Sequence, residues 1–256
     1  MMTGRDIWIS LGINLFAGVL IFVLGLAWPI LPKSYRMWKL TRFWGRGVLG
    51  DDFVIAYGSL LDSRLAEQSP PQFRFLKRFH DSRTVTVAGP TGPIVGDSEI
   101  RSISYLASSL GRFRPRALGV IRDAEAFGHL NRSFVALGSP SSNEITDLAL
   151  REPANAFLRF GQDNEGTYIE HVSSGQKMRG FEPPILRDYG IVLKIPNARF
   201  QGHHFFVCAG LGEWGTSGAA WYLATKWEQL SQDPSFGLVV DVEIGSDESA
   251  RKIALG

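Results

Sequence analysis

The chain has 256 residues, of which 45% are hydrophobic and 20% charged, a composition typical of a folded domain with a substantial core. A net charge of +2 gives no reason to expect binding to nucleic acid. Its single cysteine, Cys208, excludes an internal disulfide and sits within an apolar run, so we expect it to be a small buried side chain.

The first predicted element is an apolar segment near the N-terminus. Residues 7–31 contain no charged side chain, and about 20 apolar residues in a helix suffice to cross a hydrocarbon core. Trp8 and Trp28 lie near its two ends, where amphipathic rings favour the headgroup regions. We therefore predict a transmembrane anchor within residues 1–32. A buried core helix is the alternative interpretation.

Basic residues dominate the segment that follows, residues 33–50. Before the apolar segment, Arg5 is offset by Asp6, whereas after it come Lys33, Arg36, Lys39, Arg42 and Arg46. This bias predicts a single-pass protein of the inner (plasma) membrane, with residues 51–256 forming one cytoplasmic domain. Trp38, Phe43 and Trp44 are interleaved with the charges, so we expect this segment to lie along the membrane surface near anionic lipid.

After Gly50, strand-like apolar runs alternate with helical patterns. Strands are predicted at 53–60, 83–89, 117–122, 133–139, 189–195, 204–210 and, as the last strand, 236–244, with a hairpin around 161–166. Helices are predicted at 98–110, 123–130, 140–150 and 216–230. Asp97 is expected to cap the first of these helices, and Ser141 with Glu144 has the spacing of a capping box. The alternation predicts an α/β fold with a mostly parallel sheet and helices on both faces.

Three of the predicted strands end in turns rich in glycine and small hydroxyl residues. In an open α/β sheet, ligands bind outside the carboxyl ends of the strands, so these turns line one crevice if the strands are parallel neighbours. The turns begin at Tyr57, Gly138 and Gly210. The predicted ligand-binding residues are Gly58, Ser59, Gly138, Ser139, Ser141, Ser142, Asn143, Gly210, Gly212, Trp214, Gly215, Thr216 and Ser217.

The third turn contains the pattern G-x-G-x-x-G, formed by Gly210, Gly212 and Gly215. Glycines allow close backbone approach, and the unpaired amides of a helix N-terminus attract an anion. The pattern nevertheless lies near the end of the domain, and Glu213 within it would repel a pyrophosphate. NAD is therefore disfavoured, although Asp241 follows roughly where a ribose-binding carboxylate would. We expect a small anionic ligand, a nucleotide in preference to other anions, and assign no cofactor.

No complete catalytic or metal-binding set is evident. Glu213 and Asp97 are weak candidates for an acid/base group, while Asp97 and Glu99 read more simply as a cap and a first-turn charge. Adjacent histidines, His203 and His204, would point to opposite faces of a strand, and the other histidines lack ligand-like spacing. No metal site is predicted.

The order of these signals resembles that of an uncharacterised prokaryotic Rossmann-like family with a G-x-P-x-x-N turn, a YG…N segment and an AG…GT-x-x-A-A strand–helix unit. The resemblance covers about residues 53–230, and the matching residues are Gly138, Pro140, Asn143, Tyr189, Gly190, Asn197, Gly210, Gly215, Thr216 and Ala220. It implies a Rossmann-like fold and no particular activity. The layout is also loosely similar to single-span membrane effectors that sense nucleotide signals in bacterial antiviral defence.

Three functions stay open from the sequence. The first is a membrane-anchored sensor or effector whose cytoplasmic domain binds the ligand and controls self-association of the membrane segment. Small residues in that segment, such as Gly12, Gly18 and Gly25, allow the close helix packing of a homo-oligomer. The second is a membrane-tethered hydrolase or transferase acting on a nucleotide or glycosyl substrate. The third is a scaffold whose sheet supports contacts with a partner.

Overall fold

The computed structural model describes Phe16 and residues 30–58, 74–78, 84–88, 95–180, 186–230 and 233–253. Nearly all of the predicted transmembrane anchor lies outside these residues, and so does Ser59. Among the residues that are described, no helix combines the length and the apolar character needed to cross a membrane. The anchor therefore stays a prediction.

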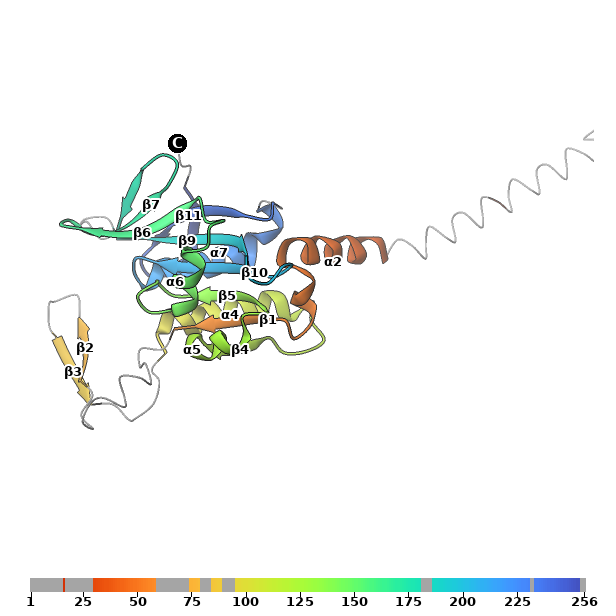
Figure 1. The fold of residues 1–256 in the computed structure, drawn as a ribbon, viewed down its shortest axis with the longest axis horizontal. Helices are drawn as coiled ribbons and strands as arrows, with labels where there is room; N and C mark the ends of the chain where they lie inside the picture. Colours follow the sequence, from red (N-terminus) through yellow and green to blue (C-terminus); the bar gives the residue numbers. More distant parts are fainter. Residues whose placement is uncertain are drawn as a thin grey trace, which may run out of the picture.

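The centre of the molecule is a seven-stranded sheet in the order β12-β11-β9-β10-β5-β1-β4 (Figure 1). Neighbouring strands β10, β5, β1 and β4 are parallel, and β11 runs in the same direction as they do, so five of the seven strands agree. This confirms the predicted α/β fold with a mostly parallel sheet. The strands are β1 (Phe53–Tyr57), β4 (Gly119–Arg122), β5 (Ser133–Leu137), β9 (Arg187–Pro196), β10 (His204–Gly210), β11 (Phe236–Glu243) and β12 (Ser246–Lys252).

Two strands of this seven-stranded sheet depart from the prediction. β9 reads as a continuous apolar run, which is typical of a parallel strand, yet it is antiparallel to both neighbours. Residues 197–203 alone join it to β10, and that connection is too short for a parallel crossover. β12 follows the predicted last strand through a tight turn in which Gly245 has φ +99°. Its polar sequence, SDESARK, is that of an edge strand and lacks an apolar run.

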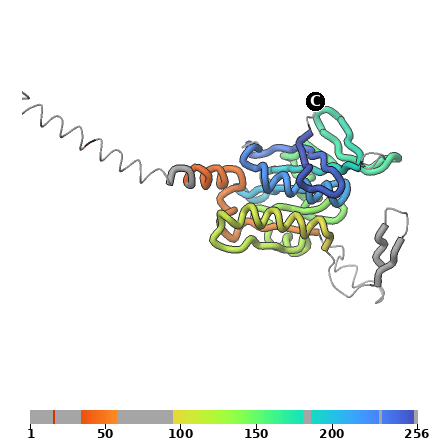
Figure 2. Tube along the Cα trace, turned by 180° about the vertical axis from the view of Figure 1, so that it is seen from behind, coloured from red at the N-terminus to blue at the C-terminus, as the bar shows by residue number. Residues whose placement is uncertain are grey.

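Helices cover both faces of the sheet, as predicted. Alternate residues of each strand point to opposite faces, so that Phe53 and Ile55 contribute to one core cluster while Val54 and Ala56 contribute to the other. The first face carries α2 (Ile30–Trp44), α4 (Asp97–Gly111) and α7 (Glu213–Lys226). Figure 2, the view from behind, shows α4 in yellow beside α7 in blue.

The second face carries α5 (Asp123–Ala126) and α6 (Glu144–Leu150). It is also covered by a three-stranded sheet formed by β6 (Leu158–Asp163), β7 (Gly166–His171) and β8 (Lys177–Arg179), which includes the predicted hairpin. The strand predicted at 83–89 exists as β3 (Thr84–Ala88). It pairs with β2 (Arg74–Arg78) in a separate two-stranded sheet and adds nothing to the main one. Three short 3-10 helices, η1 (Arg46–Leu49), η2 (Phe127–His129) and η3 (Trp227–Gln229), complete the described elements.

Helix α2 is an integral part of the domain. Leu40, Phe43 and Trp44 are fully buried, and the rings of Phe43 and Trp44 lie 5.7 and 4.7 Å from the ring of Phe206 in β10. The prediction that both aromatic residues lie at the membrane surface is therefore wrong. The spacing of Met37, Leu40 and Trp44 is that of an amphipathic helix packed on a sheet, and the interleaved charges obscured it.

Candidate functional site

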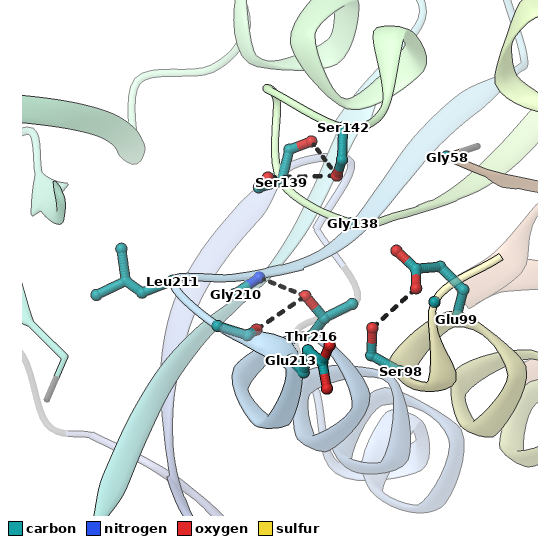
Figure 3. A pocket seen from close by; sticks show the side chains of 12 residues that line it. Gly58, Ser98, Glu99, Gly138, Ser139, Ser142, Gly210, Leu211, Glu213 and Thr216 are labelled. Atoms are coloured by element: carbon teal, nitrogen blue, oxygen red, sulfur yellow. Dashed lines mark hydrogen bonds between the residues drawn. The ribbon is translucent and has the colours of Figure 1, made fainter. Parts of the chain in front are cut away.

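The three predicted turns meet in one place. A cavity of about 210 Å³ lies at the carboxyl ends of β1, β5 and β10 (Figure 3). These strands are adjacent and parallel, so their ends share one edge of the sheet, as expected for a ligand site in an open α/β fold. The residues that line the cavity are Gly58, Gly96, Ser98, Glu99, Gly138, Ser139, Ser142, Gly210, Leu211, Gly212, Glu213 and Thr216.

Glycines allow the first two turns to approach each other. A Cβ atom added to Gly58 would lie 2.2 Å from the backbone oxygen of Ser142, a distance that no real side chain tolerates. Gly138 has φ +104°, a left-handed conformation that favours glycine. These positions set the shape of the cavity because the backbone itself forms much of its wall.

Asn143 has a structural role in this arrangement. It is 1% exposed, and its carboxamide oxygen accepts hydrogen bonds from the amides of Ile145 (2.8 Å) and Thr146 (3.1 Å). Its NH₂ group donates to the carbonyls of Ala56 (3.0 Å) and Leu137 (2.8 Å). Asn143 is therefore the N-cap of α6, and the predicted capping box of Ser141 and Glu144 is wrong. With these four bonds made, Asn143 ties β1 and β5 to α6 and is not free to orient a ligand.

A carboxylate of the protein occupies the glycine-rich turn after β10. Asp188, at the start of β9, is fully buried. One of its oxygens accepts from the amides of Tyr189 (2.8 Å) and Gly212 (3.1 Å), and the other accepts from the amide of Gly215 (2.7 Å). Burial raises the pKa of Asp188, and the three N–H donors oppose that shift. An internal anion thus takes the place that the sequence analysis assigns to a bound one.

Other amides of this turn are also engaged. The amide of Gly210 donates to the Thr216 hydroxyl (2.9 Å), and the amide of Leu211 donates to the carbonyl of Tyr189 (2.9 Å). The structure describes all four amides in the first turn of α7. Among these four, the amides of Glu213 and Trp214 have no acceptor within the described residues. The phosphate cradle predicted from G-x-G-x-x-G is accordingly reduced to these two donors.

The charge of the cavity is acidic. Glu99, in the first turn of α4, is 8% exposed and accepts a hydrogen bond from the Ser98 hydroxyl (2.8 Å). Its carboxylate lies close to Gly138, because a Cβ on that glycine would be 3.1 Å from the Glu99 Oε1 atom. Glu213 lines the same cavity from α7, and no lysine, arginine or histidine belongs to the lining among the described residues. The interpretation of Glu99 only as a first-turn charge therefore missed a buried carboxylate beside the cavity.

Several predicted site residues are held outside the cavity lining. The ring of Trp214 lies under the guanidinium of Arg101, 4.2 Å from it, and the Ser217 hydroxyl donates to the buried carboxylate of Asp247 (2.5 Å). Asp97 is the first residue of α4, with Gly96 as the N-cap, so its predicted capping role is wrong. Its exposed carboxylate pairs with Arg101. Asp97 is thus not placed to act as an acid/base group in the cavity.

Two other predicted site residues, Ser141 and Gly215, also lie outside the cavity lining. The Ser141 hydroxyl is exposed and hydrogen-bonds with that of Ser139 (2.8 Å). The backbone N–H of Gly215 donates a hydrogen bond to the carboxylate of Asp188 in β9. Neither residue belongs to the cavity lining.

The geometry does not fit a dinucleotide site. Asp241, which the sequence places near a ribose-binding position, lies in β11 and forms ion pairs with Arg187 and with Arg251 (3.1 Å). β9 lies between β10 and β11, so Asp241 does not follow the glycine-rich turn in space. Within the described ranges, no group of three or more His, Cys, Asp or Glu side chains is arranged to hold a metal ion.

Comparison with known proteins identified no similar protein. No protein-family model matches the chain, and no curated protein or solved structure shows significant similarity to it. The resemblance to a Rossmann-like family therefore stays a prediction, and the residues around the cavity carry the functional argument.

Proposed function

We propose that this protein is a membrane-anchored sensor or effector whose α/β domain binds a small hydroxyl-rich ligand, a nucleoside or a sugar, in the cavity beside Glu99. The apolar segment 7–31 would anchor the chain in the inner membrane, and the domain would lie in the cytoplasm. Ligand binding would control self-association of the membrane segment. The observation that carries the proposal is the buried Glu99 carboxylate within a wall of glycines and hydroxyls.

The chemistry of the wall favours hydroxyl groups over phosphates. A carboxylate accepts hydrogen bonds and can receive two from neighbouring hydroxyls, as a sugar ring offers. Glu99 and Glu213 would repel a phosphate placed among them, and Asp188 already takes the amides of Gly212 and Gly215 in the glycine-rich turn. A nucleotide would therefore place its sugar or base in the cavity and its phosphate outside.

The size of the cavity supports a small ligand. Its volume of about 210 Å³ is below the roughly 300–1,000 Å³ that is common for sites of drug-sized molecules. One ring system fits that space better than a dinucleotide does. Ser98 and Ser139 add hydroxyls to the lining, and such groups can complete the hydrogen bonding of such a ring.

The direct test is isothermal titration of the full chain in nanodiscs against a panel of nucleosides, nucleotides and monosaccharides. Glu99→Gln should weaken the binding of an active compound by about 10- to 100-fold, because a hydrogen bond to a charged group contributes about 1.5–3 kcal/mol. Asp97→Asn is the matched control, since Asp97 lies on the same helix outside the cavity lining. Absence of binding by every compound, with the fold intact, would refute the proposal.

A second candidate is a membrane-tethered hydrolase or transferase acting on a nucleoside or glycosyl bond. The observation that favours it is that two carboxylates, Glu99 and Glu213, line the same cavity. Cleavage of a glycosidic bond commonly uses a pair of carboxyl groups. Product release that either Glu99→Gln or Glu213→Gln abolishes would support the enzyme. Tight binding without any turnover would favour the sensor.

A further inference from the structure

Helix α2 exposes aromatic rings on the side opposite to the core. Leu40, Phe43 and Trp44 face the sheet, whereas Tyr35 and Trp38 are 57% and 51% exposed. The rings of Tyr35 and Trp38 stack on each other with their centroids 5.9 Å apart. A stacked pair of large rings facing away from the domain is a candidate contact surface.

Cations accompany these rings. The ammonium group of Lys39 lies 5.3 Å from the Tyr35 ring centroid, and the guanidinium of Arg42 lies 5.2 Å from that of Trp38. The sequence of α2, ILPKSYRMWKLTRFW, has four basic residues and no acidic one. Tyr35, Trp38, Lys39 and Arg42 thus form one aromatic and basic surface, called here the outer face of α2.

We propose that the outer face of α2 binds the headgroups of anionic phospholipids. Tyrosine and tryptophan favour the membrane interface, and basic side chains are attracted to an anionic leaflet. A second copy of the chain fits this face poorly, because a two-fold contact would bring the same cations against each other. The inference rests on the proposed membrane attachment, since α2 begins at Ile30, within the last residues of the apolar segment 7–31.

This contact would also leave the cavity uncovered, because no residue of the outer face of α2 belongs to the cavity lining. From α2 the chain passes through η1 to the start of β1, at the amino ends of the parallel strands (Figure 1). The cavity lies at the carboxyl ends of β1, β5 and β10. The start of β1 and the cavity thus lie at opposite ends of the strands, and lipid contact at the outer face of α2 leaves the cavity accessible to a soluble ligand.

The test uses the full chain in nanodiscs of phosphatidylcholine, with or without phosphatidylglycerol, each containing a headgroup spin-labelled lipid that quenches tryptophan. The difference between the chain and its Trp38→Phe variant isolates the contribution of Trp38. Quenching of Trp38 should be strong with phosphatidylglycerol and weak without it. In Lys39→Gln/Arg42→Gln the ratio of docked to undocked protein should fall about 25-fold, because each cation near an anionic surface contributes about 1 kcal/mol, or roughly fivefold.

A matched control is Arg151→Gln, which removes an exposed cation just after α6, on the other face of the sheet, and should leave the quenching unchanged. Equal quenching in both lipid compositions, or none in either, would overturn the proposal. Shielding of Trp38 that depends on protein concentration and not on lipid would identify a second copy as the partner. Extraction by alkaline carbonate tests the anchor separately. If alkaline carbonate releases the chain from the membrane, the predicted transmembrane anchor is refuted. Tryptophan quenching on anionic vesicles would still decide whether α2 binds lipid.

Discussion

Replacing Asp188 by asparagine tests whether this carboxylate holds the glycine-rich turn. Asparagine keeps one oxygen, which can still accept from Tyr189 and Gly212, but it turns an NH₂ group toward the amide of Gly215. That buried amide then has no acceptor, which costs about 1–3 kcal/mol. Part of this loss in the free energy of unfolding is offset, because burying a neutral side chain costs less free energy than burying a charged one. We expect a net destabilisation of about 1–2 kcal/mol, well above the effect of a typical surface substitution.

Two measurements check this expectation. Guanidinium unfolding of the detergent-solubilised chain, followed by near-UV circular dichroism, gives the change in the free energy of unfolding. Amide hydrogen exchange at Gly212 and Gly215 should accelerate by about 10-fold or more, because opening of the turn becomes easier by a similar free energy. Asp163→Asn is the control: its carboxylate lies at the surface, where solvent screens the pair with Arg179, so this change should affect unfolding much less than Asp188→Asn does. If Asp188→Asn is as stable as the original chain and Gly215 exchanges no faster, the carboxylate does not hold the turn.

Two further predictions concern the cavity wall and a buried cation. Gly58→Ala should abolish ligand binding and destabilise the fold by about 1–3 kcal/mol, because the added methyl group would clash with the Ser142 carbonyl. Gly128→Ala is the control: its methyl group would meet nothing within 4 Å, so neither ligand binding nor the free energy of unfolding should change. Lys194 is 1% exposed beneath Phe43, and burial lowers its pKa from 10.5 to about 8. Between these values the unfolded chain holds the proton more tightly, so stability should rise by about 3 kcal/mol as pH increases from 8 to 10.5. Unfolding curves at both pH values should show no such rise for Lys194→Met, and an equal rise in the two proteins would rule out Lys194 as its source.

The convergence of the three turns was predictable from the sequence. β1, β5 and β10 are short apolar runs that end at glycines or small polar residues, and parallel strands of this kind place their carboxyl ends at one edge. The hydrophobic pattern thus determined both the location and the main wall of the cavity. It also identified α4, α6 and α7, whose first turns contribute to that wall or support it.

The electrostatics of the site was not predictable in the same way. Asp188 belongs to β9, and its position beside the turn after β10 follows from antiparallel pairing that the local pattern does not reveal. Glu99 is a common residue for the first turn of a helix, and only the close approach of Gly138 makes it a buried carboxylate at a cavity. The G-x-G-x-x-G motif therefore correctly indicated a backbone segment that is able to bind an anion. The tertiary contacts show that the anion is the protein's own Asp188 carboxylate.

The packing of α2 has a mechanical consequence. Phe43 and Trp44 are interlocked with Phe206 in the middle of the sheet, and the same core cluster extends to Ala219 and Ala220 of α7. Helix α2 cannot rotate relative to the rest of the domain, because such a rotation would remove two rings from a close-packed interior. A change in the direction of the chain at Ile30 would consequently rotate the domain as one body, carrying the mouth of the cavity with it.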